Sequence, residues 1–395
     1  MQNYYFCDMK KTFLLLLVSA ITMAIPGYAF SQDDPGKKKG KLEPVYDIAF
    51  YYNLDNREIS PSGQRFTDAM TINAAQLTPL FGIRVKQGPE ITHKVMAGVD
   101  LVRNMGEIPT SAENANLNNT HLFQEILMFY ELERRFRDTK VTLDFGIFPR
   151  GVAEGEYTHP FMSDSVNWVS NNFAGFFAKM DRPRSHYEAG LDWYGMIGKD
   201  RREEFRVFSY GISNIAGNIY AGWKFVGHHY ANSYTVKGVV DDILAEPFIK
   251  AEIPSSMQEL YAELSWLQGM QKDRRLDGGF LMPGGTQLEL VAGKWNVFLR
   301  NRLYWGSNLM PLYDSVDDSG TKYGANLYWG TPFYMVHNDR TESWKHWGTY
   351  DRMEFSWEPK ISKYLDLKIS AVLHFNEWKY SGWQQKLTLA FTFGN

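Results

Sequence analysis

Residues 297–305 read Val297-Phe298-Leu299-Arg300-Asn301-Arg302-Leu303-Tyr304-Trp305 and alternate between two kinds of side chain. Successive side chains of a β-strand point to opposite faces. An extended 297–305 segment therefore places Leu299, Leu303 and Trp305 on one face, and Arg300 and Arg302 on the other. We predict a strand with one apolar face and one charged face.

The same two-residue period recurs along the chain. It covers residues 46–54, 95–101, 141–147, 187–193, 260–266, 353–357, 365–375 and 387–393. Turn-forming clusters such as Pro283-Gly284-Gly285 separate these segments. No segment shows convincing helical spacing. We predict an all-β chain, a transmembrane antiparallel β-barrel of about 16 strands within a range of about 14 to 18.

The N-terminal region has the three parts of a secretory signal peptide. Lys10 and Lys11 precede an apolar stretch at 13–25, which Pro26 breaks, and small residues follow near Ala29. We predict a signal peptide over 1–30 that is cleaved near Ala29, with a retained membrane anchor as the alternative. Met9 fits a true start, which would make Met1–Asp8 an extension. Residues 31–43 are predicted to be a flexible polar leader, and 44–395 a single barrel domain.

Composition excludes several classes of protein. The chain has 42 Lys and Arg against 45 Asp and Glu, a net charge of −3, which does not fit a polybasic nucleic-acid binder. Its single cysteine, Cys7, precedes the apolar stretch, so cleavage leaves a mature chain with no disulfide and no cysteine metal site.

Aromatic residues make up 15% of the chain, and several close the apolar face of a predicted strand. Indole rings favour the boundary between lipid and water. We predict an aromatic girdle formed by Trp193, Trp266, Trp305, Trp329 and Trp357. The similar segments 303–306 and 327–330, both Leu-Tyr-Trp-Gly, are interpreted as two strand ends at one lipid boundary. This pattern favours a closed membrane barrel over a soluble β protein.

The last predicted strand has apolar residues at alternate positions, Leu389, Phe391 and Phe393, and resembles the assembly signal of Gram-negative outer-membrane barrels. That signal commonly ends on its aromatic residue, whereas this chain continues with Gly394 and Asn395. Over 44–393 the chain resembles porin-type outer-membrane β-barrels. The resemblance implies export with a cleaved signal peptide, insertion by the barrel-assembly machinery and contact with outer-membrane lipid. A homotrimer is compatible with it.

The charged faces are predicted to line the lumen. The candidate pore-lining residues are Arg300, Arg302, Arg352, Glu354, Lys368, Lys386, Arg84 and Lys94. Charges of both signs across a water-filled lumen would orient polar solutes. The alternative is that these charges pair and fill a narrow barrel. The loop around 151–172, with Asp164, Asn167 and Trp168, is the candidate constriction loop.

Three functions stay open. The first is a channel for passive or weakly selective diffusion of small polar solutes or ions. The second is a non-conducting barrel that acts as a scaffold or adhesin through its loops, and the third is a secreted soluble carbohydrate-binding β protein. We predict no enzyme, no nucleic-acid partner and no catalytic, cofactor-binding or metal-binding residue, because the sequence holds no HExxH, CxxC or phosphate-binding loop motif. A barrel hydrolase stays open, since convergent sites need no signature.

Overall fold

The computed structural model describes residues 41–105, 123–162, 170–199, 201–317, 320, 322–328, 330–336 and 346–395. The predicted signal peptide and the leader up to Gly40 lie outside the described residues. The same holds for the predicted loop residues Asp164, Asn167 and Trp168, and for Trp329.

The described residues form sixteen strands. The first eight are β1 (Leu42–Ile59), β2 (Met70–Gln87), β3 (Ile91–Asn104), β4 (Phe123–Phe136), β5 (Thr139–Pro149), β6 (Asn172–Arg182), β7 (Ser185–Gly195) and β8 (Glu204–Ala216). The second eight are β9 (Ile219–Tyr230), β10 (Val240–Glu252), β11 (Glu259–Asp273), β12 (Gly284–Lys294), β13 (Val297–Ser307), β14 (Trp347–Trp357), β15 (Leu365–Asn376) and β16 (Lys379–Gly394). Short 3-10 turns occur at η2 (Arg150–Val152), η3 (Gly324–Leu327) and η4 (Pro332–Tyr334). Within the described ranges, no helix is long and apolar enough to cross a membrane.

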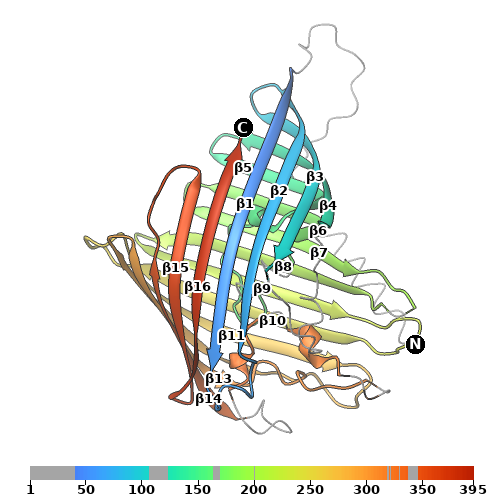
Figure 1. Ribbon diagram of the computed structural model, residues 1–395, viewed down its shortest axis with the longest axis vertical. Helices are drawn as coiled ribbons and strands as arrows, with labels where there is room; N and C mark the ends of the chain where they lie inside the picture. The colour runs from blue at the N-terminus through green and yellow to red at the C-terminus, as the bar shows by residue number, and fades with distance from the viewer. Residues whose placement is uncertain are drawn as a thin grey trace. The chain divides into compact units, whose positions relative to one another are not determined.

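The strands form one closed antiparallel barrel in sequence order. Each strand pairs with its neighbours in the chain, and β1 closes the ring against β16, with Asn53 opposite Thr388. Figure 1 shows β1 in blue beside β16 in red. The predicted all-β antiparallel barrel is therefore confirmed, and a two-sheet sandwich is excluded because a single sheet closes on itself.

The two ends of the barrel differ in their connections. Two-residue turns at 137–138, 183–184, 217–218 and 295–296 join strands at one end, which we call the short-turn end. Trp295 and Asn296 have φ of 54° and 63°, as the mirror-image turn of a tight hairpin requires. The long connections leave from the opposite, long-loop end, with one short exception at 377–378.

The two faces of each strand differ as the sequence predicted. On β14, Phe355 and Trp357 are 46% and 47% exposed, whereas Arg352, Glu354 and Ser356 are buried inside the barrel. A water-soluble protein normally shows the reverse pattern. An apolar exterior around a charged interior is the pattern of a barrel set in lipid.

Candidate functional site

The predicted pore-lining residues of β13 to β15 meet on the inner wall in one network of ion pairs. Arg300 Nη1 lies 2.6 Å from Glu358 Oε1, and Lys368 Nζ lies 3.4 Å from the same oxygen. Lys368 Nζ also lies 2.7 Å from Glu354 Oε1, whose second oxygen is 2.7 Å from Arg352 Nη2. The network stays in contact with water, since the Lys368 side chain is 39% exposed. Arg300, Glu358 and Lys368 thus form a charged surface that reaches water in the lumen, whereas Arg352 and Glu354 are buried.

A second group of charged residues, more buried than the first, lies on the part of the wall between β13 and β9. Arg302 Nη2 lies 2.5 Å from Glu289 Oε2 on the neighbouring strand β12. Lys224 Nζ on β9 lies 2.7 Å from Glu263 and 3.4 Å from Glu246. Burying such charges is costly unless each has a close partner, and here each has one.

Two of the remaining predicted lining residues lie on the other side of the β1–β16 closure. Arg84 on β2 and Lys94 on β3 are direct cross-strand neighbours. Arg84 Nη2 lies 3.2 Å from Glu43, and Lys94 Nζ lies 2.7 Å from Glu131. Lys386 lies on β16, between β15 and β1. The eight predicted residues therefore do not gather at one point but follow the inner wall.

Two acids of this buried group were not predicted from the sequence: Glu246, which pairs with Lys224, and Glu289, which pairs with Arg302. Both alternate with more exposed neighbours, Glu246 on β10 and Glu289 on β12. The two-residue period of those strands was the signal that could have found them. Glu246 also accepts hydrogen bonds from Ser265 and Gln287, so it is a centre of the network.

The start of the β5–β6 connection, residues 150–162, lies inside the barrel. Arg150 is 5% exposed and places Nη2 2.7 Å from Asp192 on β7. The carboxylate of Glu188, also on β7, accepts the backbone N–H of Glu154 at 2.7 Å and the hydroxyl of Tyr157 at 2.5 Å. The described part of the predicted constriction loop is thus bonded to the inner wall.

A second connection, β13–β14, also enters the lumen, and the sequence did not predict this. Its described residues within 308–336 are called here the inner loop. Tyr334 donates to Gln287 Oε1 at 2.6 Å, and Asn376 donates to the carbonyl oxygen of Phe333 at 2.8 Å. Gln271 donates to the carbonyl oxygen of Leu309 at 2.7 Å. Bonds to β11, β12 and β15 thus fix the inner loop at several points of the wall.

The inner loop corrects one interpretation of the sequence. Leu327, Tyr328 and Gly330 do not form a strand end at a lipid boundary, because Leu327 ends η3 and Tyr328 is buried. Tyr328 donates to Gln271 Oε1 at 2.6 Å, and its ring packs at 5.6 Å from Phe161 of the β5–β6 loop. The Leu-Tyr-Trp-Gly likeness to 303–306 therefore reflects similar composition and not similar placement.

Tyr323 bonds the inner loop to the end of β11. The Tyr323 hydroxyl donates to Asp273 at the end of β11, and Arg275 Nη2 lies 2.6 Å from the same carboxylate. Burial raises the pKa of Tyr323 to about 12, so the phenol keeps the proton that it donates.

The described girdle candidates lie on the outer face. Trp193, Trp266, Trp305 and Trp357 are between 36% and 56% exposed. Trp305 packs against Trp347 with ring centroids 4.9 Å apart near the long-loop end. Trp357 lies at the other end of the wall, opposite Val297. This placement at both ends is the one that a girdle needs.

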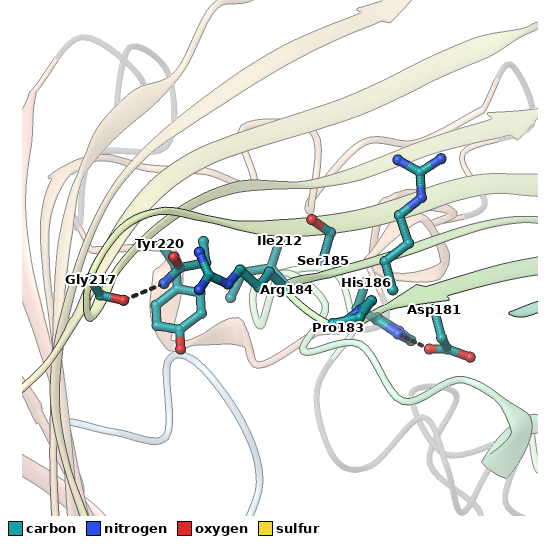
Figure 2. Close-up of a pocket in the computed structure, with 10 residues that line it drawn as sticks. Asp181, Pro183, Arg184, Ser185, His186, Ile212, Gly217 and Tyr220 are labelled. Carbon is teal, nitrogen blue, oxygen red and sulfur yellow. Dashed lines mark hydrogen bonds and ion pairs between the residues drawn. The ribbon is translucent and has the colours of Figure 1, made fainter. Parts of the chain in front are cut away.

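A cavity of about 440 Å³ opens at the short-turn end (Figure 2). The β6–β7 and β8–β9 turns form it, and its lining includes Asp181, Arg184, His186, Asn214 and Tyr220. The lining is mostly polar, so water and small polar solutes can occupy it.

No family model and no curated protein matches the chain. Among solved structures, OccK1 (OpdK) of Pseudomonas aeruginosa is similar at 10% identity and a TM-score of 0.44, covering 89% of this chain and 99% of that one. The outer membrane protein OprD of P. aeruginosa is similar at 12% identity and a TM-score of 0.43, covering 93% and 98%. A loop-deleted OmpT of Vibrio cholerae is similar at 6% identity and a TM-score of 0.49, covering 90% and 100%.

The architecture of the described residues indicates which kind of β-barrel this is. A single antiparallel sheet closes through sixteen strands, turns apolar side chains outward and keeps its charges inside. Only closed barrels and helices satisfy the backbone in lipid, and a charged interior of this kind belongs to barrels with a polar lumen. The described residues thus form a closed antiparallel β-barrel with the apolar outer face and charged interior that are typical of membrane-spanning barrels.

Proposed function

We propose that this protein is an outer-membrane channel for passive or weakly selective passage of small polar solutes or ions. The observation that carries the proposal is the ion-pair network on the inner wall, in which the side chains of Arg300, Glu358 and Lys368 are 24%, 26% and 39% exposed and adjoin the buried pair of Arg352 and Glu354. A barrel that only anchored loops would not need water-exposed charges along its interior. A barrel of about 16 strands has room for an aqueous path.

The two loops inside the lumen fit a selective channel better than a wide pore. Residues 150–162 and the inner loop pack on each other through Phe161 and Tyr328, and through His159 and Tyr334. Solutes would pass between these loops and the charged wall. Charges of both signs on that wall would favour small dipolar solutes and exclude large apolar ones.

Conductance of the purified protein in planar lipid bilayers tests the proposal. We expect discrete current steps that are smaller than those of an unobstructed barrel of the same strand number. Solute-swelling of loaded liposomes measures size selection in the same preparation. A folded barrel, identified by its heat-modifiable gel mobility, that stays silent in both measurements would contradict the proposal.

A second candidate function is a non-conducting barrel that serves as a scaffold or adhesin. The observation that favours it is the filling of the lumen by buried inner-loop side chains such as Leu309, Phe333, Tyr334 and Val336. It predicts no current for the wild type and none after the inner loop is shortened. Current that appears only in the shortened variant would instead support a channel that the inner loop closes.

A further inference from the structure

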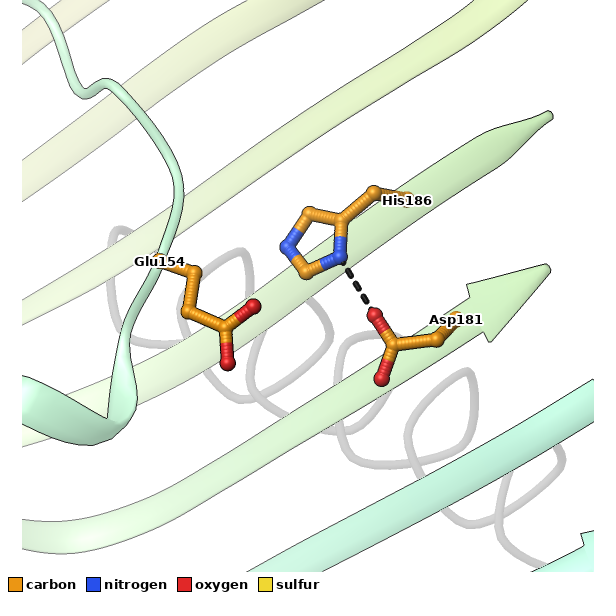
Figure 3. Close-up of side chains that lie close together, drawn as sticks. All are labelled: Glu154, Asp181 and His186. Atoms are coloured by element: carbon orange, nitrogen blue, oxygen red, sulfur yellow. Dashed lines mark hydrogen bonds and ion pairs between the residues drawn. The ribbon is translucent and has the colours of Figure 1, made fainter. Parts of the chain in front are cut away.

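Three metal-binding side chains meet on the inner wall near the 183–184 turn (Figure 3). Asp181 on β6 and His186 on β7 are direct cross-strand neighbours, and Glu154 comes from the β5–β6 loop. One ligand atom from each lies within 4.8 Å of the other two. The three come from separate elements of the fold, so tertiary structure brings them together.

A fourth residue outside this group orients the imidazole. His186 Nε2 lies 2.8 Å from Glu188 Oε1, and an ionised carboxylate can only accept, so Nε2 carries a proton and donates it. The Glu188 side chain is fully buried and is fixed by Tyr157 and by the backbone N–H groups of Glu154 and Gly155. Metal-binding histidines commonly donate their second N–H to a carboxylate in this way, which fixes the ring and its free nitrogen.

The second ring nitrogen of His186 also faces a carboxylate. His186 Nδ1 lies 2.6 Å from Asp181 Oδ1. The Asp181 carboxylate can only accept as well, so Nδ1 donates a proton to it in the ion-free protein, and a bound metal ion would displace that proton. The buried Glu188 thus holds His186 with Nδ1 toward Asp181, so that loss of the Nδ1 proton would give a metal ion one nitrogen and one oxygen ligand side by side.

We propose that His186 Nδ1 and the carboxylates of Asp181 and Glu154 bind a divalent transition-metal ion, for which Zn²⁺ is the best match. Zn²⁺ accepts mixed nitrogen and oxygen ligands, whereas Ca²⁺ and Mg²⁺ prefer oxygen alone. Ligands at about 2.1 Å around a tetrahedral ion lie about 3.4 Å apart, so small side-chain rotations close the group around it. Because the Glu154 side chain is 62% exposed, water could supply a fourth ligand.

Lys179 is the competitor for this ion. Its Nζ lies 2.5 Å from Glu154 Oε1, so the ammonium group and the metal draw on the same carboxylate. Metal binding therefore weakens this ion pair. Because Glu154 belongs to the loop inside the lumen, the ion would tie that loop to the β6–β7 hairpin.

Isothermal titration with ZnCl₂ tests the proposal on the full barrel in detergent, without a polyhistidine tag and after treatment with a chelator. We expect one saturable site in the wild type. The variants His186→Gln and Asp181→Asn should weaken binding by more than about tenfold. His93→Gln is the matched control, because His93 contacts Tyr130 and Gln87 instead of acids, and it should bind as the wild type does.

Lys179→Met is a more specific test than the variants that weaken binding. Removing the competing ammonium group should raise the affinity for Zn²⁺. An unchanged or lower affinity in that variant, or a wild type without a saturable site, would overturn the proposal. So would a Co²⁺ absorption spectrum of the wild type identical to that of hydrated Co²⁺, a measurement that needs no variant. Binding is measured without conduction, so this result is independent of the channel proposal.

Discussion

Arg302 and Glu289 face each other inside the barrel, with both Nε and Nη2 of the arginine within 2.6 Å of one carboxylate oxygen. The other oxygen of Glu289 accepts the Tyr261 hydroxyl at 2.9 Å. The Glu289 side chain is only 6% exposed. A carboxylate placed in this way depends on its arginine, because little water reaches it.

Arg302→Met should therefore lower the free energy of unfolding by about 3–5 kcal/mol, measured by urea titration of the barrel in lipid vesicles. Arg135→Met is the control, since the Arg135 side chain is 63% exposed in its pair with Glu133, and it should cost no more than about 1 kcal/mol. The double variant Arg302→Met/Glu289→Gln should recover part of the loss. If Arg302→Met and Arg135→Met lower the free energy of unfolding equally, the result would contradict the burial of Glu289.

Charge reversal on the inner wall should change ion preference if the channel proposal holds. Arg300→Glu replaces a partly exposed lumen cation with an anion and should move the reversal potential in a salt gradient toward cation selectivity. Lys360→Glu is the control, because Lys360 is exposed in the 358–364 connection beyond the wall. A reversal potential that stays unchanged in a folded, conducting variant would remove Arg300 from the conduction path.

Lipid exposure of the outer wall can be tested with two leucines of similar exposure. Leu264, at 55%, lies within β11, and Leu276, at 59%, lies in the β11–β12 connection. Leu264→Arg should lower the free energy of unfolding in vesicles by about 2–4 kcal/mol, as charges on the lipid face do near the midplane. Leu276→Arg should have little effect, since its side chain stays in water. Similar small effects from both would mean that β11 does not face hydrocarbon.

Much of the barrel could be predicted from local sequence pattern. The alternation in 297–305 and around 353–357 predicted that Arg300 and Arg302, and likewise Arg352 and Glu354, share the charged face of a strand, because successive side chains of a strand point to opposite faces. The alternation did not reveal the pairing of Arg302 with Glu289, since the partner lies on a strand whose register is set by the whole sheet.

The path of the inner loop could not be predicted from this two-residue alternation. Residues 308–336 have no period of two, and segment 327–330 resembles a strand end in composition alone. Its position follows from long-range hydrogen bonds such as Tyr334 to Gln287 and Phe333 to Asn376, which join residues far apart in the chain. Local sequence propensity does not predict such contacts, so only the structure shows that the inner loop fills the lumen.

Weakening the inner loop's attachment should increase current through the barrel. Tyr334→Phe removes the hydroxyl that donates to Gln287 at 2.6 Å and should cost about 1 kcal/mol of loop attachment. We expect longer or larger openings in planar bilayers, and a further increase when Asn376→Ala removes the bond to Phe333. Tyr380→Phe is the control, because Tyr380 is 45% exposed on β16 and its loss of a hydroxyl should leave the current unchanged. If the double variant conducts as the wild type does, the inner loop does not limit passage, and solutes must follow a path along the wall that its attachment leaves unaffected.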